Sequence, residues 1–256
     1  MAHETAEIKN VNMEEIKIRE LIIPDVHCRT FWKEPVERFL SCEDDTKIVF
    51  LGDYLDGYEH EWEDRKYIKD GITRLEEIID IKKKHPNNVV LLLGNHDCGY
   101  AIDESICSSR MDYENKNIIK KLFQDNRECF QLIYKDEDVL FSHAGVHRGF
   151  LKRTGIDDKQ FDSILNNAWL TDNMDILWTL CMYDGYRGFS VYEYGSPIWA
   201  DVRSYFKKTE PVDENLGYQI FGHTQLAHDP IITEFFACLD CRKCFTINGK
   251  NEIKEV

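Results

Sequence analysis

Five short polar motifs are the parts of this chain best suited to chemistry, because each follows an apolar run and carries side chains that bind metals. In chain order they are Asp25-Val26-His27, Gly52-Asp53-Tyr54-Leu55-Asp56, Gly94-Asn95-His96-Asp97, Ser142-His143-Ala144-Gly145 and Gly222-His223-Thr224. Carboxylate, amide and imidazole ligands in combination suit a pair of divalent metal ions. A metal pair in turn indicates hydrolysis of a phosphate ester.

The overall charge of the chain restricts its partners. Its 256 residues include 47 acidic and 32 basic ones, which gives a formal net charge of −15. Binding along a nucleic-acid backbone needs clustered Lys and Arg, and an anionic membrane surface repels a protein of negative charge. We therefore expect neither nucleic acid nor a membrane as partner, although bound metal ions could still create a local positive site for phosphate.

The beginning of the chain predicts no export. Residues 1–15 are interpreted as a polar leader, because they lack the apolar region and the cleavage pattern of a signal peptide. Apolar runs such as Val89–Leu93 have the length of a strand and fall short of the ~18 residues of a membrane span. These features predict a cytoplasmic protein.

The cysteine pattern favours reduced thiols. The nine cysteines are scattered and odd in number, which is typical of a cytosolic protein rather than of a disulfide framework. Cys238, Cys241 and Cys244 are evenly spaced, but a structural zinc site usually has four ligands, and no second Cys or His pair lies nearby. We interpret the three as small, partly buried thiols, with a metal or redox role as the alternative.

The first part of the chain alternates strands and helices. Apolar runs predict the strands, and Ile72, Leu75 and Ile79 recur at helical spacing. This alternation is typical of βαβ units and a largely parallel sheet, in which ligands bind beyond the carboxyl ends of the strands. The polar motifs occupy those ends. The predicted strands are 16–23, 47–51 and 89–93, and the predicted helices are 33–41 and 65–84.

The second part is less regular, and we expect it to form a second sheet with further helices. Its alternating segment 231–247 is predicted to complete that sheet. Without a repeat or a linker, residues 16–256 are predicted to form one domain. The other expected elements are helices over 115–125 and within 157–182, strands over 128–134, 138–141 and 218–221, and a loop over 183–197.

With these motifs the chain resembles the calcineurin-like metallophosphoesterases. Within that superfamily it is most similar to the phosphoprotein-phosphatase branch and its bacterial relatives, which include serine/threonine phosphatases and diadenosine tetraphosphate hydrolases. The matching motifs extend from Asp25 to His223. The resemblance implies an α/β fold, a four-layer sandwich in which helices flank two packed mixed β-sheets.

The resemblance also implies a role for each motif. A hydroxide that bridges two metal ions would attack phosphorus, and Mn²⁺ is expected, with Fe or Zn as alternatives. His96 would lie outside the metal shell and donate a proton to the leaving group, while Asp56 would orient it. Asp25 and His27 would bind the first metal, Asp53 would bridge both metals, and Asn95, His143 and His223 would complete the second. The glycines Gly52, Gly94 and Gly222 fit tight turns that bring backbone close to the ions.

Three departures from the family pattern matter. Gly57 stands where the phosphatase branch usually has an arginine that grips phosphate, and the candidate replacements are Arg187 and Arg203. Either could instead be a surface residue or part of a structural ion pair. Pro24 and Cys28 stand where that branch usually has glycines, and Gln225 takes the place of a histidine ligand found in other relatives. Of the histidines outside the motifs (His3, His60, His85, His147 and His228) only His147 and His228 lie near enough for a minor substrate role.

The function that these residues predict is metal-dependent hydrolysis of phosphate monoesters, on a phosphoprotein or a small ester. The aromatic segment 178–199 could stack a base, so a phosphodiesterase or dinucleoside polyphosphate hydrolase is the alternative. A third possibility is an interaction module that keeps the fold without catalysis. The sequence leaves the oligomeric state open.

Overall fold

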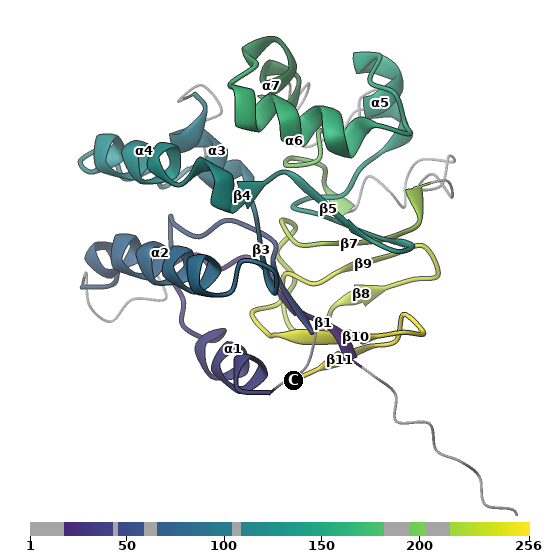
Figure 1. The fold of residues 1–256 in the computed structure, drawn as a ribbon, viewed down its shortest axis with the longest axis horizontal. Coiled ribbons are helices and arrows are strands. Elements are labelled where there is room, and N and C mark those ends of the chain that lie inside the picture. Colours follow the sequence, from purple (N-terminus) through teal and green to yellow (C-terminus); the bar gives the residue numbers. More distant parts are fainter. Residues whose placement is uncertain (1–17, 43–45, 59–65, 104–108, 182–194, 203–215) are drawn as a thin grey trace, which may run out of the picture.

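The computed structural model describes residues 18–42, 46–58, 66–103, 109–181, 195–202 and 216–256 (Figure 1). The predicted leader 1–15 and most of the predicted loop 183–197 lie outside these ranges. Within them, no helix has both the length and the apolar character needed to cross a bilayer.

The first sheet has six strands in the order β11-β10-β1-β2-β3-β4. Neighbouring pairs from β1 to β4 are parallel, and β10 and β11 extend the sheet in antiparallel fashion. The predicted strands of the first part are therefore confirmed. The strands are β1 (Ile18–Ile23), β2 (Lys47–Phe50), β3 (Val89–Leu92), β4 (Phe130–Gln131), β10 (Phe245–Asn248) and β11 (Ile253–Glu255).

The second sheet has five strands in the order β5-β6-β7-β9-β8. Its centre is parallel, since β6 pairs with β7 and β7 with β9 in that sense, while β5 and β8 are antiparallel edges. The strands are β5 (Ile133–Asp136), β6 (Val139–Ser142), β7 (Tyr218–Phe221), β8 (Ile231–Ile232) and β9 (Phe236–Cys238).

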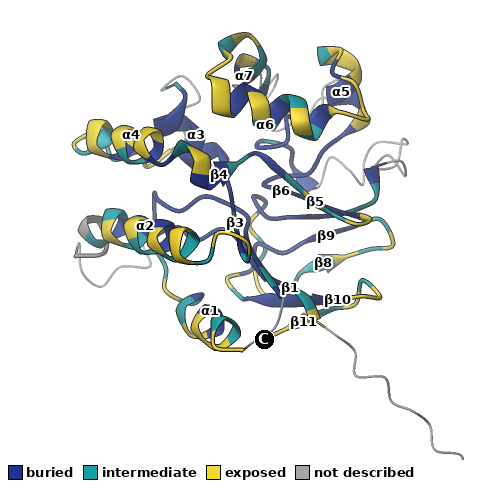
Figure 2. Cartoon of the chain, in the orientation of Figure 1, coloured by how far each residue is buried: buried dark blue, intermediate teal, exposed yellow. Residues whose placement is uncertain are grey.

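The apolar runs are continuous because both faces of the strands are buried (Figure 2). Successive side chains of a strand point to opposite faces. Ile22 of β1 accordingly packs between the sheets with Phe141 and Ile220 of the second sheet. Its neighbours Leu21 and Ile23 belong to the core that the helices cover.

Helices flank this pair of sheets, as predicted, and their polar faces lie toward solvent (Figure 2). Figure 1 shows α1 and α2 along the first sheet and α6 against β5 of the second. The helices are α1 (Lys33–Leu40), α2 (Lys66–Lys84), α3 (Asn95–Ala101), α4 (Lys116–Asp125), α5 (Arg148–Thr154), α6 (Phe161–Thr171) and α7 (Met174–Cys181).

Two strand predictions were wrong. The segment 128–134 is not one strand: a short 3-10 turn leads into β4, and β5 then belongs to the other sheet. The side chain of Asn166 accepts hydrogen bonds from the N–H groups of Leu132 and Ile133, at 2.8 and 3.1 Å, where the chain changes sheets.

The segment 231–247 likewise does not stay in the second sheet. Beyond β9 the chain bends, with Arg242 in the left-handed conformation, and β10 pairs antiparallel with β1 of the first sheet. An alternating apolar pattern does not show this bend, because residues on both sides of it are buried.

Candidate metal centre

The five polar motifs meet at one edge of the two sheets, because each begins where a strand ends. Asp25 follows β1, Asp53 follows β2 and Asn95 follows β3, all from the first sheet. His143 and His223 follow β6 and β7 of the second sheet. Backbone hydrogen bonds join the loops, such as those from His27 N to Asp53 O at 2.7 Å and from Gly222 N to His143 O at 2.8 Å.

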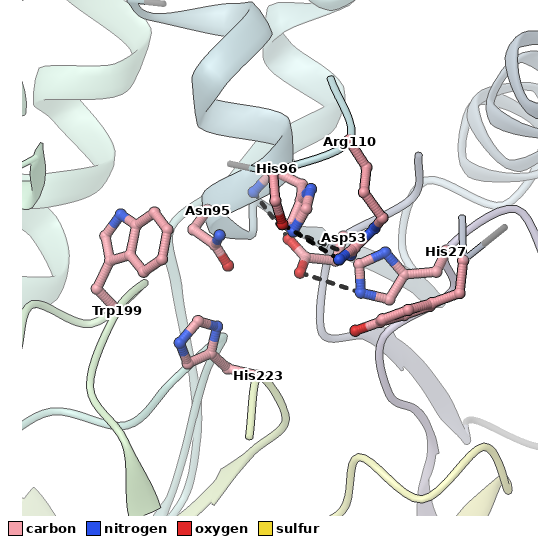
Figure 3. A pocket seen from close by; sticks show the side chains of 9 residues that line it. His27, Asp53, Asn95, His96, Arg110, Trp199 and His223 are labelled. Atoms are coloured by element: carbon pink, nitrogen blue, oxygen red, sulfur yellow. Dashed lines mark hydrogen bonds and ion pairs between the residues drawn. The ribbon is translucent and has the colours of Figure 1, made fainter. Parts of the chain in front are cut away.

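A pocket opens at this meeting point, and Figure 3 shows imidazoles, a carboxylate and an amide turned toward it. The described residues that line it come from both sheets and from the loops between them. They are His27, Asp53, Tyr58, Asn95, His96, Ser109, Arg110, Trp199 and His223.

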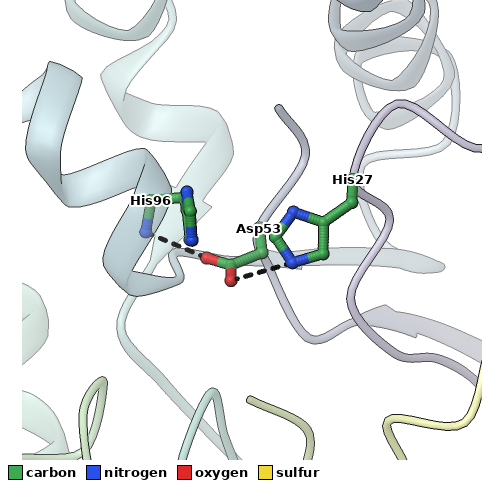
Figure 4. Close-up of side chains that lie close together, drawn as sticks. All are labelled: His27, Asp53 and His96. Carbon is green, nitrogen blue, oxygen red and sulfur yellow. Dashed lines mark hydrogen bonds and ion pairs between the residues drawn. The ribbon is translucent and has the colours of Figure 1, made fainter. Parts of the chain in front are cut away.

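One group of possible metal ligands consists of His27, Asp53 and His96, whose donor atoms all lie within 4.8 Å of one another (Figure 4). His27 Nε2 is 3.5 Å from Asp53 Oδ2 and 4.0 Å from Asp25 Oδ2. All four side chains are buried. Two carboxylates and imidazole nitrogens thus converge on one small volume.

A second group consists of Asp53, His143 and His223, again with donor atoms within 4.8 Å. His143 Nε2 lies 3.1 Å from Asn95 Oδ1, 3.1 Å from His223 Nδ1 and 3.5 Å from Asp53 Oδ2. Asp53 belongs to both groups. The arrangement therefore suits two cations that share this carboxylate.

Backbone carbonyl groups fix the orientation of the imidazoles. The Nδ1 of His27 lies 2.9 Å from Leu55 O, and the Nδ1 of His143 lies 2.8 Å from Leu51 O. Because Nδ1–H donates to a carbonyl oxygen, Nε2 of each ring is left as a lone-pair donor toward the pocket. Metal-binding histidines are commonly held in this way.

The carboxylates are fixed by backbone N–H groups. Asp25 accepts a hydrogen bond from His223 N at 2.9 Å, and Asp53 accepts one from His96 N at 3.0 Å. Asp97 accepts bonds from Gly94, Asp53 and Tyr54 N–H groups, at 2.8, 2.7 and 3.0 Å. The Asp97 carboxylate thereby ties the Asp53 loop to the start of α3.

The predicted close approach of glycines to the site is confirmed. A Cβ at Gly94 would collide with the Asp53 carboxylate, and one at Gly222 would collide with that of Asp25. Gly52 has φ +104° and lies against the backbone of Gly94. Only glycine fits such approaches without displacing its neighbours.

Several other residues of these loops adopt the left-handed conformation although they carry side chains. Cys28, which stands where the resembling branch usually has glycine, has φ 61°. The loop therefore keeps a glycine-like backbone there. Such strain persists where the surrounding structure imposes it, and it concentrates at functional sites. The other residues in this group are His27, Asp53, Asp56 and His223.

The electrostatics of the site favour an added cation. Burial raises the pKa of Asp25 to about 6 and that of Asp53 to about 8. Burial also lowers the pKa of His27 well below its usual value. Buried carboxylates are unfavourable without a counter-charge, whereas neutral imidazoles and carboxylates are the donors that divalent metals bind. The donor set therefore fits a metal pair.

The predicted hydrogen bond between Asp56 and His96 is present, with 2.7 Å between Asp56 Oδ2 and His96 Nδ1. The Tyr100 hydroxyl donates to the other oxygen of Asp56. All eight predicted metal-site and catalytic residues thus lie together. The two predicted phosphate-binding residues, Arg187 and Arg203, lie outside the described residues.

Other candidates lie away from the pocket or serve the fold. Gln225 is exposed to solvent. The buried ring of His147 accepts a hydrogen bond from Gly149 N and caps α5. Cys238 is fully buried, and burial raises the pKa of Cys241 to about 11 and that of Cys244 to about 12. These cysteines are therefore protonated thiols, and they are free of disulfide bonds, as are Cys28, Cys42, Cys98 and Cys129.

Three pocket residues were missed by the sequence analysis, whereas Trp199 belongs to the aromatic segment 178–199 that was expected to stack a base. Of the missed residues, Tyr58 supplies an aromatic ring, and Ser109 and Arg110 supply polar groups from the chain before α4. None belongs to an apolar run or a motif, so no pattern could have indicated them. Asp97, in contrast, is part of the Gly-Asn-His-Asp motif, and its position gave a signal that we did not use.

Comparisons with known proteins agree with this geometry. The family model described as calcineurin-like phosphoesterase matches residues 18–227. A similar solved structure is a protein serine/threonine phosphatase from Saccharomyces cerevisiae, described as similar to human phosphatase PP5. It has a TM-score of 0.54 and 13% identity, over 95% of this chain and 81% of that one. No curated protein sequence matches the chain.

Proposed function

The chain belongs to the calcineurin-like phosphoesterase family, and we propose that it hydrolyses phosphate monoesters with two divalent metal ions. As a member of this family it is a metal-dependent phosphoesterase. The observation that carries the proposal is the Asp53 carboxylate, whose Oδ2 lies 3.5 Å from Nε2 of both His27 and His143. A second support is the fold that the chain shares with a serine/threonine phosphatase.

We assign the donors by their position around Asp53. Asp25 and His27 would hold the first ion, and Asp53 would contribute to both. Asn95, His143 and His223 would hold the second ion. When bound, such a pair, with Mn²⁺ the first candidate, activates water as a nucleophile and stabilises negative charge on phosphoryl oxygens. The protein's own part is to keep each donor fixed through backbone hydrogen bonds.

We assign His96 to proton transfer. Its Nδ1 is held by Asp56 at 2.7 Å, and its ring lines the pocket. The Asp56 carboxylate stabilises positive charge on the ring, so Nε2–H can be donated to the leaving oxygen. The Tyr100 hydroxyl holds the Asp56 carboxylate in turn. This chain of contacts fixes the donor before substrate arrives.

One observation favours a second candidate, hydrolysis of a phosphodiester or a dinucleoside polyphosphate. Trp199 lines the pocket, and its ring centroid lies 5.6 Å from that of His223. An aromatic ring at the rim could stack on a nucleobase. A non-catalytic role is not favoured, because the metal-binding donors are all present and preoriented.

Hydrolysis of two model esters tests the proposal. Metal-stripped protein is titrated with Mn²⁺ while p-nitrophenyl phosphate and bis-p-nitrophenyl phosphate are supplied separately, and bound metal is counted in parallel. We expect turnover of the monoester that rises with bound metal and saturates near two ions. Preference for the diester would select the second candidate. Two bound ions without turnover of either ester would reject the proposal.

A further inference from the structure

The pocket contains one side chain whose permanent positive charge has no part in the proposed function so far. Among the described residues that line the pocket, Arg110 is the only lysine or arginine. It extends toward Asp53 and His96 in Figure 3. The other lining groups are carboxylate, amide, hydroxyl, imidazole and aromatic, so Arg110 is the group best able to bind a phosphoryl oxygen that faces away from the metals.

Hydrogen bonds and a ring contact hold the Arg110 side chain in place. Its Nε donates to the backbone oxygen of Asp56 at 3.0 Å. Its Cζ lies 3.9 Å from the centre of the Tyr58 ring, in a cation–π contact. Its Nη2 lies 3.4 Å from His96 Nε2, which accepts a hydrogen bond from the guanidinium only while Nε2 carries no proton. The guanidinium is therefore oriented before a ligand binds, which reduces the entropy lost on binding.

The backbone supports the same conclusion. Arg110 has φ 80°, in the left-handed region that residues with side chains seldom adopt. Arg110 is an exposed residue, so burial does not explain why its side chain points at the pocket. The Asp56 carbonyl and the Tyr58 ring do, and both belong to the loop that carries Asp53.

We propose that Arg110 binds the phosphoryl oxygens of the substrate. It would so replace the arginine that the phosphatase branch usually has at the position of Gly57. The inference rests on the proposed function. A guanidinium offers paired N–H donors that match two phosphoryl oxygens. Asp56 contacts both the proton donor and the proposed phosphate-binding residue: its carboxylate holds His96 and its backbone carbonyl holds Arg110. The phosphoryl oxygens and the leaving oxygen would thus be positioned from one loop.

The experiment compares Arg110→Met and Arg110→Lys with a matched control. Arg29→Met serves as control, because the Arg29 guanidinium lies 5.3 Å from the same Tyr58 ring but does not line the pocket. Each variant is loaded with Mn²⁺, its metal content is measured, and its affinity for inorganic phosphate is determined by calorimetry. KM and kcat for p-nitrophenyl phosphate are measured on the same samples.

We expect Arg110→Met to keep its metals and to bind phosphate about 10- to 100-fold more weakly, with a rise in KM of similar size. Arg110→Lys should lie between, because it keeps the charge but loses the paired geometry. Arg29→Met should stay within about twofold of the parent. Melting temperatures identify any variant that fails to fold, and Arg110→Gln then replaces Arg110→Met.

Unchanged phosphate affinity and KM in a folded Arg110→Met with full metal content would overturn the assignment, while an active parent enzyme would still support the proposed function. Equal losses of phosphate affinity in the Arg29 and Arg110 variants would also overturn it, because the loss would then reflect the removal of any nearby positive charge. If the parent binds phosphate but hydrolyses neither ester, the proposed function fails, and the loss of binding in Arg110→Met still decides the role of this residue.

Discussion

The two ends of the paired sheets both bury carboxylates, but the partners of those carboxylates differ. At the carboxyl ends of β2 and β6, Asp53 lies among imidazoles, 3.5 Å from the nearest ring nitrogens of His27 and His143. At the opposite, amino end of β1, Glu20 lies 3.5 Å from Nε of Arg19. Burial raises the pKa of both Asp53 and Glu20 to about 8.

The difference lies in where the positive charge comes from. Arg19 ties the sheets together at the amino end, with an ion pair to Glu137 at 3.1 Å and a hydrogen bond to Asp136 O at 3.2 Å. That end already contains its cation. The carboxyl end gathers neutral donors and carboxylates around a pocket without an arginine among the ligands. A raised carboxyl pKa alone therefore does not indicate a functional site, whereas convergence with imidazoles does.

The largest difference between the two ends is expected for substitutions of Asp53 and Glu20. Asp53→Asn should weaken both metal sites together and lower turnover by more than about 10,000-fold, because the shared carboxylate is lost and water is no longer activated. Metal counting on dialysed protein checks this. Glu20→Gln makes the same chemical change at the other end and should keep both ions and the rate. Loss of only one ion from Asp53→Asn would reject the shared role.

At the carboxyl end, a substitution of His96 separates metal binding from proton transfer, since His96 lies beside the ligands but is assigned to proton transfer. His96→Ala should keep both ions and lower kcat by about 100- to 10,000-fold, the range that general acid catalysis contributes. Metal content and kcat are measured on the same preparation. Its donor atoms also lie within 4.8 Å of those of His27 and Asp53, so loss of a metal in this variant would make it a ligand instead.

The sequence was sufficient for the parts of the molecule that local patterns determine. The three runs that became β1, β2 and β3 are buried on both faces, and such runs are recognisable without knowing their partners. The residue after a parallel strand must lie at the carboxyl edge of the sheet. The meeting of Asp53 with His27 and His143 could therefore be predicted, although the roles of these residues remain proposals.

The sequence was insufficient where a residue's position depends on distant contacts. Arg110 reaches the pocket because the Asp56 carbonyl and the Tyr58 ring hold it. The spacing of residues in the sequence gives no sign of these contacts. The α3 helix was not predicted, because its 7 residues are all buried and are too few to show an amphipathic period. The departure of β10 from the second sheet likewise depends on its pairing with β1.

Glu20→Gln gives the smallest expected effect, on stability alone. The folded pKa of about 8 lies above the usual 4.5, chiefly because of burial and then the Asp136 carboxyl. Between these values the folded protein keeps a proton that the unfolded chain releases. The free energy of unfolding must then fall as pH rises through this window, by at most about 1.4 kcal/mol per pH unit from this group.

The amide that Glu20→Gln introduces cannot titrate, so the variant should lack this component of the pH dependence. Urea unfolding of metal-free parent and variant at pH 6 and pH 8 measures it, and the contributions of Asp25 and Asp53 cancel in the difference. We expect the parent to lose about 1 to 3 kcal/mol more than the variant over this interval. If the free energy of unfolding depends on pH equally in parent and variant, Arg19 keeps Glu20 ionised. The carboxylates at the two ends of the sheets would then differ in protonation as well as in partners.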